Sequence, residues 1–328
     1  MNELQTTSDP WRLCLAPMMK RTDRHFRFLV RLISREVRLF TEMVTTGAIL
    51  YGDSPRFLAY DVSEHPIVLQ LGGSEPDALR ACSEHAAAAG FDEINLNCGC
   101  PSDRVQSGAF GACLMADPQL VCELMSAMAE GAGKAEVSIK TRLGIDHLYS
   151  YSYFRDFVGK VAEAGCRIFY IHARKAWLTG LSPRENREIP PLNYDWVYRL
   201  KQDFPALRII VNGGITSAHD LDGHLQHVDG VMIGRRAYDA PWDFVAMSKE
   251  THIQPRIARD EDRVLSEYSD YIEKELLAGT RLTEMTQHLV HLYAGRPGAR
   301  SWRRHLSEKA RLPGAGPEVV TSARQYVG

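Results

Sequence analysis

The chain has 328 residues, of which 45% are hydrophobic and 24% are charged, and its formal net charge is −2 at pH 7. The length allows one large domain with a smaller one beside it, and the composition is that of an ordinary globular protein. The charge balance excludes a polycationic protein, so any nucleic-acid site must be a local basic patch.

The sequence also argues against a membrane or secreted protein. No apolar stretch approaches the roughly 20 residues that a transmembrane helix needs, and residues 1–17 lack the basic-then-apolar layout of a signal peptide. The seven cysteines are an odd number scattered over apolar segments, which does not indicate a disulfide framework. We therefore expect a reduced, cytoplasmic protein that does not bind membranes, and nothing in the sequence indicates a protein partner.

Short apolar runs alternate with helical patterns up to about residue 247. The runs that predict strands are residues 12–18, 39–43, 66–72, 93–98, 137–143, 167–173, 208–214 and 230–236. Amphipathic stretches such as 77–89 and 153–164 lie between them and are followed by glycine, a usual helix stop. Eight β–α repeats over roughly 250 residues predict an α/β fold, the (β/α)8 TIM barrel. A doubly wound sheet is the main rival, but no glycine-rich phosphate loop follows the first run.

The pattern changes after residue 246, where the strand-like runs stop. Helical patterns continue at residues 260–278, 281–295, 299–310 and 317–327. We therefore predict two domains, a catalytic barrel over residues 1–247 and a small all-helical domain over residues 248–328.

Polar residues gather where the predicted strands end. In a TIM barrel the functional groups lie at the carboxyl ends of the strands and in the loops that follow them. A buried polar group without a partner costs a few kcal/mol, so a shared polar ligand is the simplest explanation for so many of them. In chain order, the residues at these ends are Ala16, Pro17, Met18, Glu42, Gln70, Asn95, Asn97, Cys100, Lys140, Arg142, His172, Arg174, Asn212, Gly213, Gly214, Gly234 and Arg235.

The last two strand ends indicate a phosphate. Residues 212–214 read Asn-Gly-Gly, and residues 234–235 read Gly-Arg one strand later. Glycines leave backbone N–H groups open, and the loops after strands seven and eight are the usual phosphate cradle of these barrels. Either pair alone is a weak signal, whereas the two together favour phosphate binding over two ordinary turns.

Lys140 lies inside an apolar alternation and has two interpretations. It can be a lysine that reaches the surface from a strand end. It can also be a fixed positive charge that faces an electron-rich ring, because reduction of a flavin places negative charge at the N1–O2 edge of that ring. With Gln70 and His172 on neighbouring strands, a phosphate cradle and a lysine inside one barrel predict FMN.

Two cysteines stand one residue apart in the sequence Asn-Leu-Asn-Cys-Gly-Cys-Pro-Ser, residues 95–102. A structural zinc site would need a second Cys or Cys/His pair, and a redox pair would need the spacing C-x-x-C, so we expect neither and no metal site. Cys98 is most simply a small buried residue. Cys100 comes after the strand has ended, and a thiol with an ordinary pKa of about 8.5 is mostly protonated at neutral pH. Cys100 is therefore a candidate general acid.

At this point the sequence resembles the tRNA-dihydrouridine synthase family. The similarity extends over the whole predicted barrel, and the segments at residues 172–198 and 295–307 resemble the A-type bacterial members of the family. One departure is Cys98, where many relatives have another small residue. The matching motifs are APM (16–18), QLGG (70–73), INLNCGCP (94–101), KTRLG (140–144), HAR (172–174), NGGI (212–215) and GR (234–235).

The resemblance implies a flavin-dependent reduction of tRNA. NADPH would reduce FMN, and hydride would pass from flavin N5 to C6 of a flipped-out uracil while Cys100 protonates C5 from the other face. Asn97 would contact the uracil edge, and A-type members modify uridines 20 and 20a of the D-loop. The residues that the resemblance assigns to FMN are Pro17, Met18, Met19, Gln70, Lys140, His172, Asn212, Gly213, Gly214, Gly234 and Arg235.

Basic residues support an RNA partner independently of the resemblance. Residues 296–311 carry one acid, Glu308, and a one-sided guanidinium face of Arg300, Arg303 and Arg304, with Trp302 and His305 nearby. Such a run is often only a solvated helix, but beside a flavin barrel it favours phosphate binding. Arg184 and Arg187, with Asn186, form a second basic loop after the sixth strand, and the resemblance implies that both regions orient tRNA.

Two other functions remain open from the sequence. A barrel that reduces a free pyrimidine, such as a dihydroorotate dehydrogenase, would share the fold, the lysine and the active-site Cys or Ser, but would have no need of the arginine-rich helix. A non-catalytic tRNA-binding protein would tolerate loss of Cys100, Lys140 and His172, yet all three are present.

Overall fold

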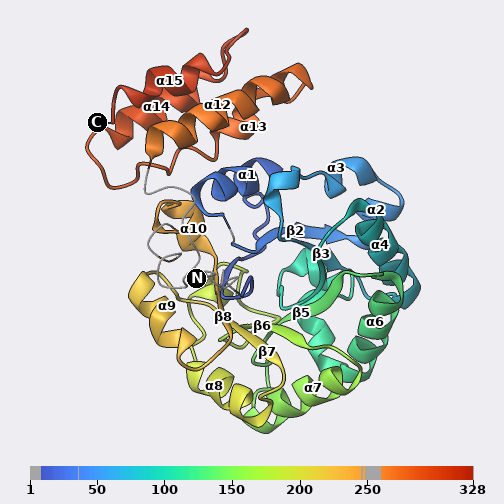
Figure 1. Ribbon diagram of the computed structural model, residues 1–328. Coiled ribbons are helices and arrows are strands. Elements are labelled where there is room, and N and C mark those ends of the chain that lie inside the picture. Colours follow the sequence, from blue (N-terminus) through green and yellow to red (C-terminus); the bar gives the residue numbers. More distant parts are fainter. Residues whose placement is uncertain (1–8, 36, 245–246, 248–259, 328) are drawn as a thin grey trace, which may run out of the picture.

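In the computed structural model, which describes residues 9–35, 37–244, 247 and 260–327, eight parallel strands form one sheet in the order β1-β8-β7-β6-β5-β4-β3-β2. Backbone hydrogen bonds from Leu15 N to Arg38 O (2.8 Å) and from Arg38 N to Leu13 O (3.0 Å) join the two ends of the sheet. The sheet is therefore closed into the predicted barrel (Figure 1). The strands are β1 (Leu13–Leu15), β2 (Leu39–Thr45), β3 (Ile67–Gly72), β4 (Glu93–Cys98), β5 (Glu136–Arg142), β6 (Ile168–His172), β7 (Arg208–Asn212) and β8 (Gly230–Ile233).

Helices surround the barrel, and their ends follow local sequence signals. Helix α4 begins with Pro76 and stops at Gly90, which has φ +89°. The side chains of Ser150 and Ser217 accept hydrogen bonds from backbone N–H groups at the starts of two further helices of this ring. The barrel helices are α1 (Arg24–Ile33), α2 (Thr46–Leu50), α3 (Ser54–Leu58), α4 (Pro76–Ala89), α5 (Asp103–Gln106), α6 (Pro118–Gly131), α7 (Tyr151–Glu163), α8 (Tyr194–Asp203), α9 (Ala218–Leu225) and α10 (Arg235–Asp239), with 3-10 turns η1 (Val62–Glu64), η2 (Gly111–Ala116) and η3 (Glu185–Arg187).

The barrel interior divides into an apolar layer and a polar end. Phe40 and Tyr170 meet edge to face, with ring centroids 4.9 Å apart, inside a cluster that also contains Met232. Toward the amino ends of the strands, the buried carboxylate of Glu93 pairs with Arg38 at 2.8 Å. This packed floor leaves the carboxyl ends of the strands as the open side of the barrel.

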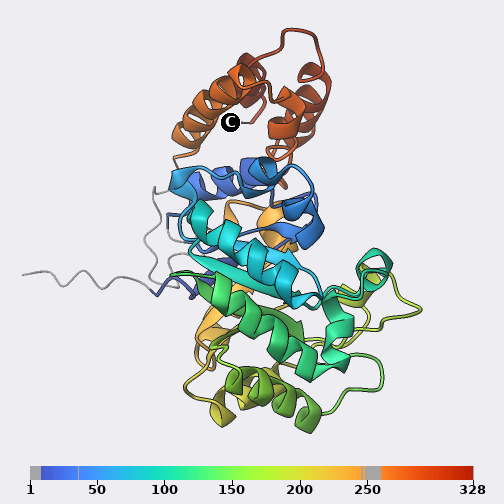
Figure 2. The ribbon, with the colours of Figure 1, turned by 90° about the vertical axis from the view of Figure 1, so that its right-hand side faces the viewer.

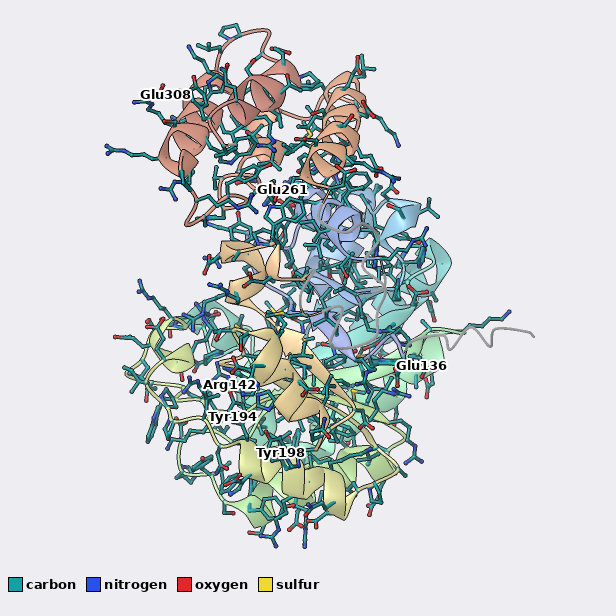
Figure 3. The ribbon with its side chains drawn as sticks, turned by 60° about the vertical axis from the view of Figure 1, so that its left-hand side comes forward. Glu136, Arg142, Tyr194, Tyr198, Glu261 and Glu308 are labelled. Atoms are coloured by element: carbon teal, nitrogen blue, oxygen red, sulfur yellow. The ribbon has the colours of Figure 1, made fainter. Side chains whose placement is uncertain are left out.

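All strands run in one direction, so their carboxyl ends meet on one side. Figure 3 places Glu136 and Arg142, the first and last residues of β5, on opposite sides of the barrel. The loops that follow β4 and β6 project from the side on which Arg142 lies, as Figure 2 shows for the right-hand edge of the molecule. The residues that the sequence places at strand ends are thereby gathered on one face.

The C-terminal helices pack on the barrel through α1. Phe28 of α1 stacks on Tyr271 with ring centroids 4.1 Å apart. The buried His288 contacts Asp23, the N-cap of α1, at 2.9 Å between Nε2 and Oδ2. The helices of this part are α12 (Glu261–Leu277), α13 (Leu282–Thr286), α14 (Ala299–Lys309) and α15 (Glu318–Arg324). The predicted border between residues 247 and 248 adjoins a segment, 248–259, outside the described residues, so the division into two domains stays a prediction.

One predicted helix is much shorter than expected. Residues 281–295 show a helical pattern, but α13 ends at Thr286 and the chain continues in turns whose N–H groups bond three residues back. In this arrangement the carbonyl of Leu289 accepts a hydrogen bond from Nε1 of Trp302 at 2.8 Å. The apolar periodicity was therefore correct about burial and wrong about the helix, because tertiary hydrogen bonds override the local preference.

Trp302, which the sequence places near the arginines of α14, belongs to the core of the helical part. Its side chain is fully buried and packs edge to face on Tyr293, with centroids 4.8 Å apart. No helix in the part of the chain that the structure describes is long and apolar enough to span a membrane.

We expect Trp302→Ala to lower the free energy of unfolding of the helical part by about 3–5 kcal/mol, as for other buried tryptophans. Arg304→Ala, on the exposed side of the same helix, should change it by less than about 0.5 kcal/mol. Hydrogen–deuterium exchange of residues 260–327 with and without urea measures both. Equal effects of the two substitutions would contradict the core assignment.

Candidate active site

A cavity of about 510 Å³ opens at the carboxyl ends of the strands. Its volume lies in the usual range for a cofactor or small-molecule site. Cationic side chains line it, and no aspartate or glutamate is among the described residues of its wall. The lining residues are Ala16, Pro17, Met18, Met19, Arg21, Met43, Gln70, Asn97, Gly99, Cys100, Pro101, Ser102, Lys140, Arg142, His172, Pro183, Arg187, Asn212, Gly213, Gly214, Ile215, Thr216, Met232, Gly234, Arg235 and Arg236.

Most of the side chains predicted from the sequence meet in this one cavity. Every residue assigned to FMN lines it, as do Cys100, Asn97 and Arg187. Arg184 does not; its side chain is 78% exposed and lies 3.6 Å from Glu188. Arg300 and Arg303 are on α14, outside the cavity, with exposed side chains.

The loop after β7 provides room for a phosphate. Gly213 and Gly214 have φ of +109° and +75°, a conformation that favours glycine. A Cβ on Gly213 would lie 2.4 Å from Cδ2 of His172, and one on Gly214 would lie 2.6 Å from Cδ1 of Leu192. Both positions therefore require glycine, which leaves their backbone open toward the cavity.

Tyr194 supports this loop from behind. Its hydroxyl donates to the carbonyl of Gly213 at 2.6 Å, and its ring meets that of His224 edge to face at 4.4 Å. Burial raises the pKa of Tyr194 to about 12, so the hydroxyl keeps its proton for this bond. Figure 3 shows Tyr194 and Tyr198 side by side on α8. The sequence interpretation missed Tyr194, because a helix residue far from the strand ends has no motif that marks it.

Lys140 and His172 give the cavity an unusual electrostatic character. Burial and the nearby Arg142 lower the pKa of Lys140 to about 7. Its Nζ lies 3.2 Å from Oδ1 of Asn212. Burial, Arg142 and Lys140 hold the pKa of His172 well below its ordinary value, so this imidazole is neutral. An anionic ligand would therefore meet a lysine whose charge it stabilises and a neutral histidine able to share a hydrogen bond.

The donor set suits FMN. Open glycine backbone beside Arg235 fits a phosphate, and Lys140 fits the electron-rich edge of a reduced ring. Gln70 and Asn97 offer the amide groups that a flavin or uracil edge can bond. With no aspartate or glutamate among its described residues, the wall favours an anion over a cation.

Cys100 lies at the mouth of the cavity and Cys98 lies in the core. Cys98 is fully buried, as expected of a packing residue. Burial raises the pKa of its thiol. Cys100 is half-buried and its Sγ lies 3.5 Å from Oγ of Ser102. The carbonyl of Cys100 accepts from Ala112 N at 2.9 Å, which ties the loop to η2.

Arg142 fastens the loop of Cys100 to the loop after β6. Its Nε donates to the carbonyl of Gly99 at 2.9 Å, and its Nη1 donates to the carbonyls of Lys175 at 3.0 Å and Asn186 at 2.9 Å. Asn186 is fully buried and donates to the carbonyl of Trp177 at 2.9 Å. Arg142 was expected at a strand end, but its bracing role could not be seen without the loop conformation.

A row of contacts runs from the cavity wall to His291, which precedes α14 in the chain. The guanidinium of Arg21, a lining residue, lies over the ring of Tyr238 at 4.7 Å, and this ring lies 5.7 Å from that of His291. Burial lowers the pKa of His291, with Asp239 opposing and Arg303 adding to the shift. Arg303 is therefore near the end of this row. Arg296, in contrast, is paired with Glu261 at 2.6 Å.

The chain is similar to known proteins over nearly its whole length. The family model described as "Dihydrouridine synthase (Dus)" matches residues 14–325. A relative from Vibrio vulnificus named "tRNA-dihydrouridine(20/20a) synthase" is 52% identical over 313 residues, which are 95% of this chain and 95% of the relative. A relative of the same name from Escherichia coli O6:H1 is 51% identical over 326 residues, covering 99% of this chain and 98% of its own.

A solved structure with the same fold is "Morphinone reductase", at a TM-score of 0.52 and 12% sequence identity. The match covers 76% of this chain and 88% of that protein. At this identity the likeness concerns the fold alone, and it agrees with the barrel.

The pKa of Lys140 predicts how cofactor binding depends on pH. Below pH 7 the lysine is already protonated, whereas above it an anionic flavin must bind together with a proton. We expect the dissociation constant of FMN from the flavin-free protein to rise by up to about tenfold per pH unit above pH 7. Lys140→Gln should lose this rise, and fluorescence titration measures both proteins. Identical pH profiles would contradict the role given to Lys140.

Proposed function

Because the chain belongs to the dihydrouridine synthase family, we propose that it reduces the C5=C6 bond of uridines 20 and 20a in the tRNA D-loop to 5,6-dihydrouridine. FMN is the proposed cofactor and NADPH the reductant. The observation that carries this proposal is a cavity in which the glycine loop, Lys140 and Cys100 meet and whose described lining residues include no acid. The cytoplasm is the expected compartment, since all seven cysteines are free thiols.

Residues from several strand ends would hold the cofactor. Gly213, Gly214 and Arg235 would bind the phosphate, and Lys140 would stand at the edge where reduction places charge. When bound, FMN supplies the hydride that adds to C6 of the uracil. A stacked base cannot reach this cavity, so the target uridine has to leave the stack.

Cys100 is the proposed proton donor to C5. It lies at the mouth, on a loop held by Arg142 and by the side-chain oxygen Oδ1 of Asn97. Asn97 is 8% exposed and lines the cavity, so its amide can contact the uracil edge. Protonation at C5 as hydride arrives at C6 gives the saturated ring without a charged intermediate in the cavity.

The helical part is the proposed tRNA platform. Arg300, Arg303 and Arg304 are exposed on α14. Figure 3 shows Glu308 of α14 on the outer surface of the helical part. Arg21 adds a cationic side chain on the cavity wall and contacts Tyr238, which lies beside His291 of the helical part, and Arg184 and Arg187 lie on the other loop. We propose residues 1–247 as the catalytic domain and 248–328 as the tRNA-binding domain.

The arginine face favours tRNA over a free pyrimidine as the substrate, since a small substrate makes no use of it. A non-catalytic tRNA-binding protein would not need the glycine loop or Lys140. A flavin absorption spectrum of the purified protein would support the catalytic proposal, and its absence would support the non-catalytic one.

Loss of the thiol should remove the reaction and leave binding intact. We expect Cys100→Ala to lower dihydrouridine formation by about 10²- to 10⁴-fold, the usual contribution of a general acid. FMN content and tRNA affinity should stay unchanged. Cys122→Ala, a half-buried cysteine of α6, is the matched control. Unchanged turnover of Cys100→Ala would place the acid elsewhere.

If the arginines of α14 bind tRNA phosphates, the affinity for tRNA should depend on salt concentration through them. We expect Arg300→Glu with Arg303→Glu to weaken tRNA binding and to reduce the slope of log affinity against log salt by about 1 to 2, as two phosphate contacts are lost. The control is Arg80→Glu with Arg155→Glu, which makes the same charge change on the outer barrel wall. If both pairs have the same effect, α14 is not the platform.

A further inference from the structure

A continuous row of buried hydrogen bonds runs through the barrel from its floor to the active-site loop. Oγ of Ser138 donates to Oε1 of Glu93 at 2.6 Å, and Nδ2 of Asn95 donates to Oγ of Ser138 at 2.7 Å. Nε2 of Gln70 donates to Oδ1 of Asn95 at 2.8 Å, and Nδ2 of Asn97 donates to Oε1 of Gln70 at 2.8 Å. Each of these side chains is at most 8% exposed. We call these residues the amide relay.

The relay ends on the loop of Cys100. Oδ1 of Asn97 accepts from the backbone N–H of Gly99 at 3.1 Å and from that of Cys100 at 3.0 Å. One carbonyl oxygen therefore holds the two peptide groups that determine where the thiol lies. This works only while Asn97 turns its oxygen, and not its NH₂ group, toward the loop.

Chemistry at both ends determines the direction of every bond in the relay. A carboxylate only accepts, and Glu93 also accepts from Arg38, Trp11 and Tyr170 at 2.8, 3.1 and 3.2 Å. A backbone N–H only donates. With an acceptor at one end and donors at the other, each amide between them has one orientation that satisfies all partners.

We propose that Glu93, on the barrel floor, is a positioning residue that orients the amide of Asn97 through Ser138, Asn95 and Gln70 and so holds the loop of Cys100. The importance of that loop rests on the proposed function. The relay itself is independent of it, because all its bonds are within the protein. Glu93 contacts neither the cavity nor any reacting group.

The relay predicts what happens when its acceptor end is lost. In Glu93→Gln the new amide can turn its oxygen to Arg38 and its NH₂ to Ser138, which makes the serine donate to Asn95 instead. Asn95, Gln70 and Asn97 then invert in turn. The inversion leaves an NH₂ group of Asn97 against two backbone N–H groups, and the loop loses both bonds.

A second substitution should repair this loss at the other end. In Glu93→Gln with Asn97→Asp, the carboxylate at position 97 accepts from Gly99 and Cys100 and also from the inverted Gln70. Every donor again has an acceptor. Damage to the barrel floor itself could not be repaired from position 97. Comparison of the single and double variants therefore distinguishes a change in amide orientation from general destabilisation.

The test is hydrogen–deuterium exchange of the peptide that spans residues 97–102 in the FMN-loaded protein. We expect Glu93→Gln to exchange about tenfold faster at Gly99 and Cys100, the effect of losing a hydrogen bond, and the double variant to return to within about twofold of wild type. Alkylation of Cys100, with Cys122 as the internal reference, should follow the same order. Unchanged exchange in Glu93→Gln, or a double variant as fast as the single one, would overturn the proposal.

A milder variant keeps the proposal testable if Glu93→Gln does not fold. Ser138→Ala leaves the contacts of Glu93 with Arg38 in place and breaks only the relay, so exchange should rise about threefold. Thr141→Val removes a buried hydroxyl of the same strand outside the relay and should leave exchange unchanged. Equal exchange in Ser138→Ala and Thr141→Val would overturn the relay. Failure to form dihydrouridine would instead reject the proposed function, since exchange does not require turnover.

Discussion

Closure of the parallel sheet is the constraint on which the rest of the structure depends. The backbone bonds between Leu15 and Arg38 join the first strand to the start of the second, while β1 pairs with β8 on its other side. Without that closure, the loop after β1 would not lie opposite the cysteine loop of β4. Because every strand runs the same way, closure brings residues from distant parts of the chain to one mouth.

The charges of that mouth are arranged for an anion. Arg235 pairs at 2.6 Å with Glu188, an acid that does not line the cavity, whereas the described wall itself carries no acid. The cost of burying Lys140 beside Arg142 is a lysine that is easily neutralised when no anion is bound. An anionic ligand offsets that cost, so binding and charge are coupled in the same few residues. On the floor of the barrel, in contrast, the buried charges of Glu93 and Arg38 neutralise each other within the protein.

The sequence alone predicted the barrel well and the supports of the site poorly. Strands such as β4 agree with the predicted run because short apolar alternation reports burial directly. Position at a strand end was enough to find Lys140 and His172. It could not reveal Tyr194, which bonds to the carbonyl of Gly213 from a helix, or the bonds of Glu93, because hydrogen bonds between residues far apart in the chain leave no local pattern. The burial of Trp302 could not be predicted for a related reason, since its position next to arginines does not tell which side of the helix is buried.

The central claim is that one cavity delivers hydride and a proton to opposite carbons of a uracil extruded from tRNA. Unmodified tRNA, FMN and NADPH labelled with deuterium at the transferable position of nicotinamide C4 test it most directly, with the products mapped by mass spectrometry and NMR. The account predicts dihydrouridine at positions 20 and 20a, with the label at C6 and solvent hydrogen at C5. Label at C5, or no dihydrouridine in tRNA while a free pyrimidine is reduced, would contradict it.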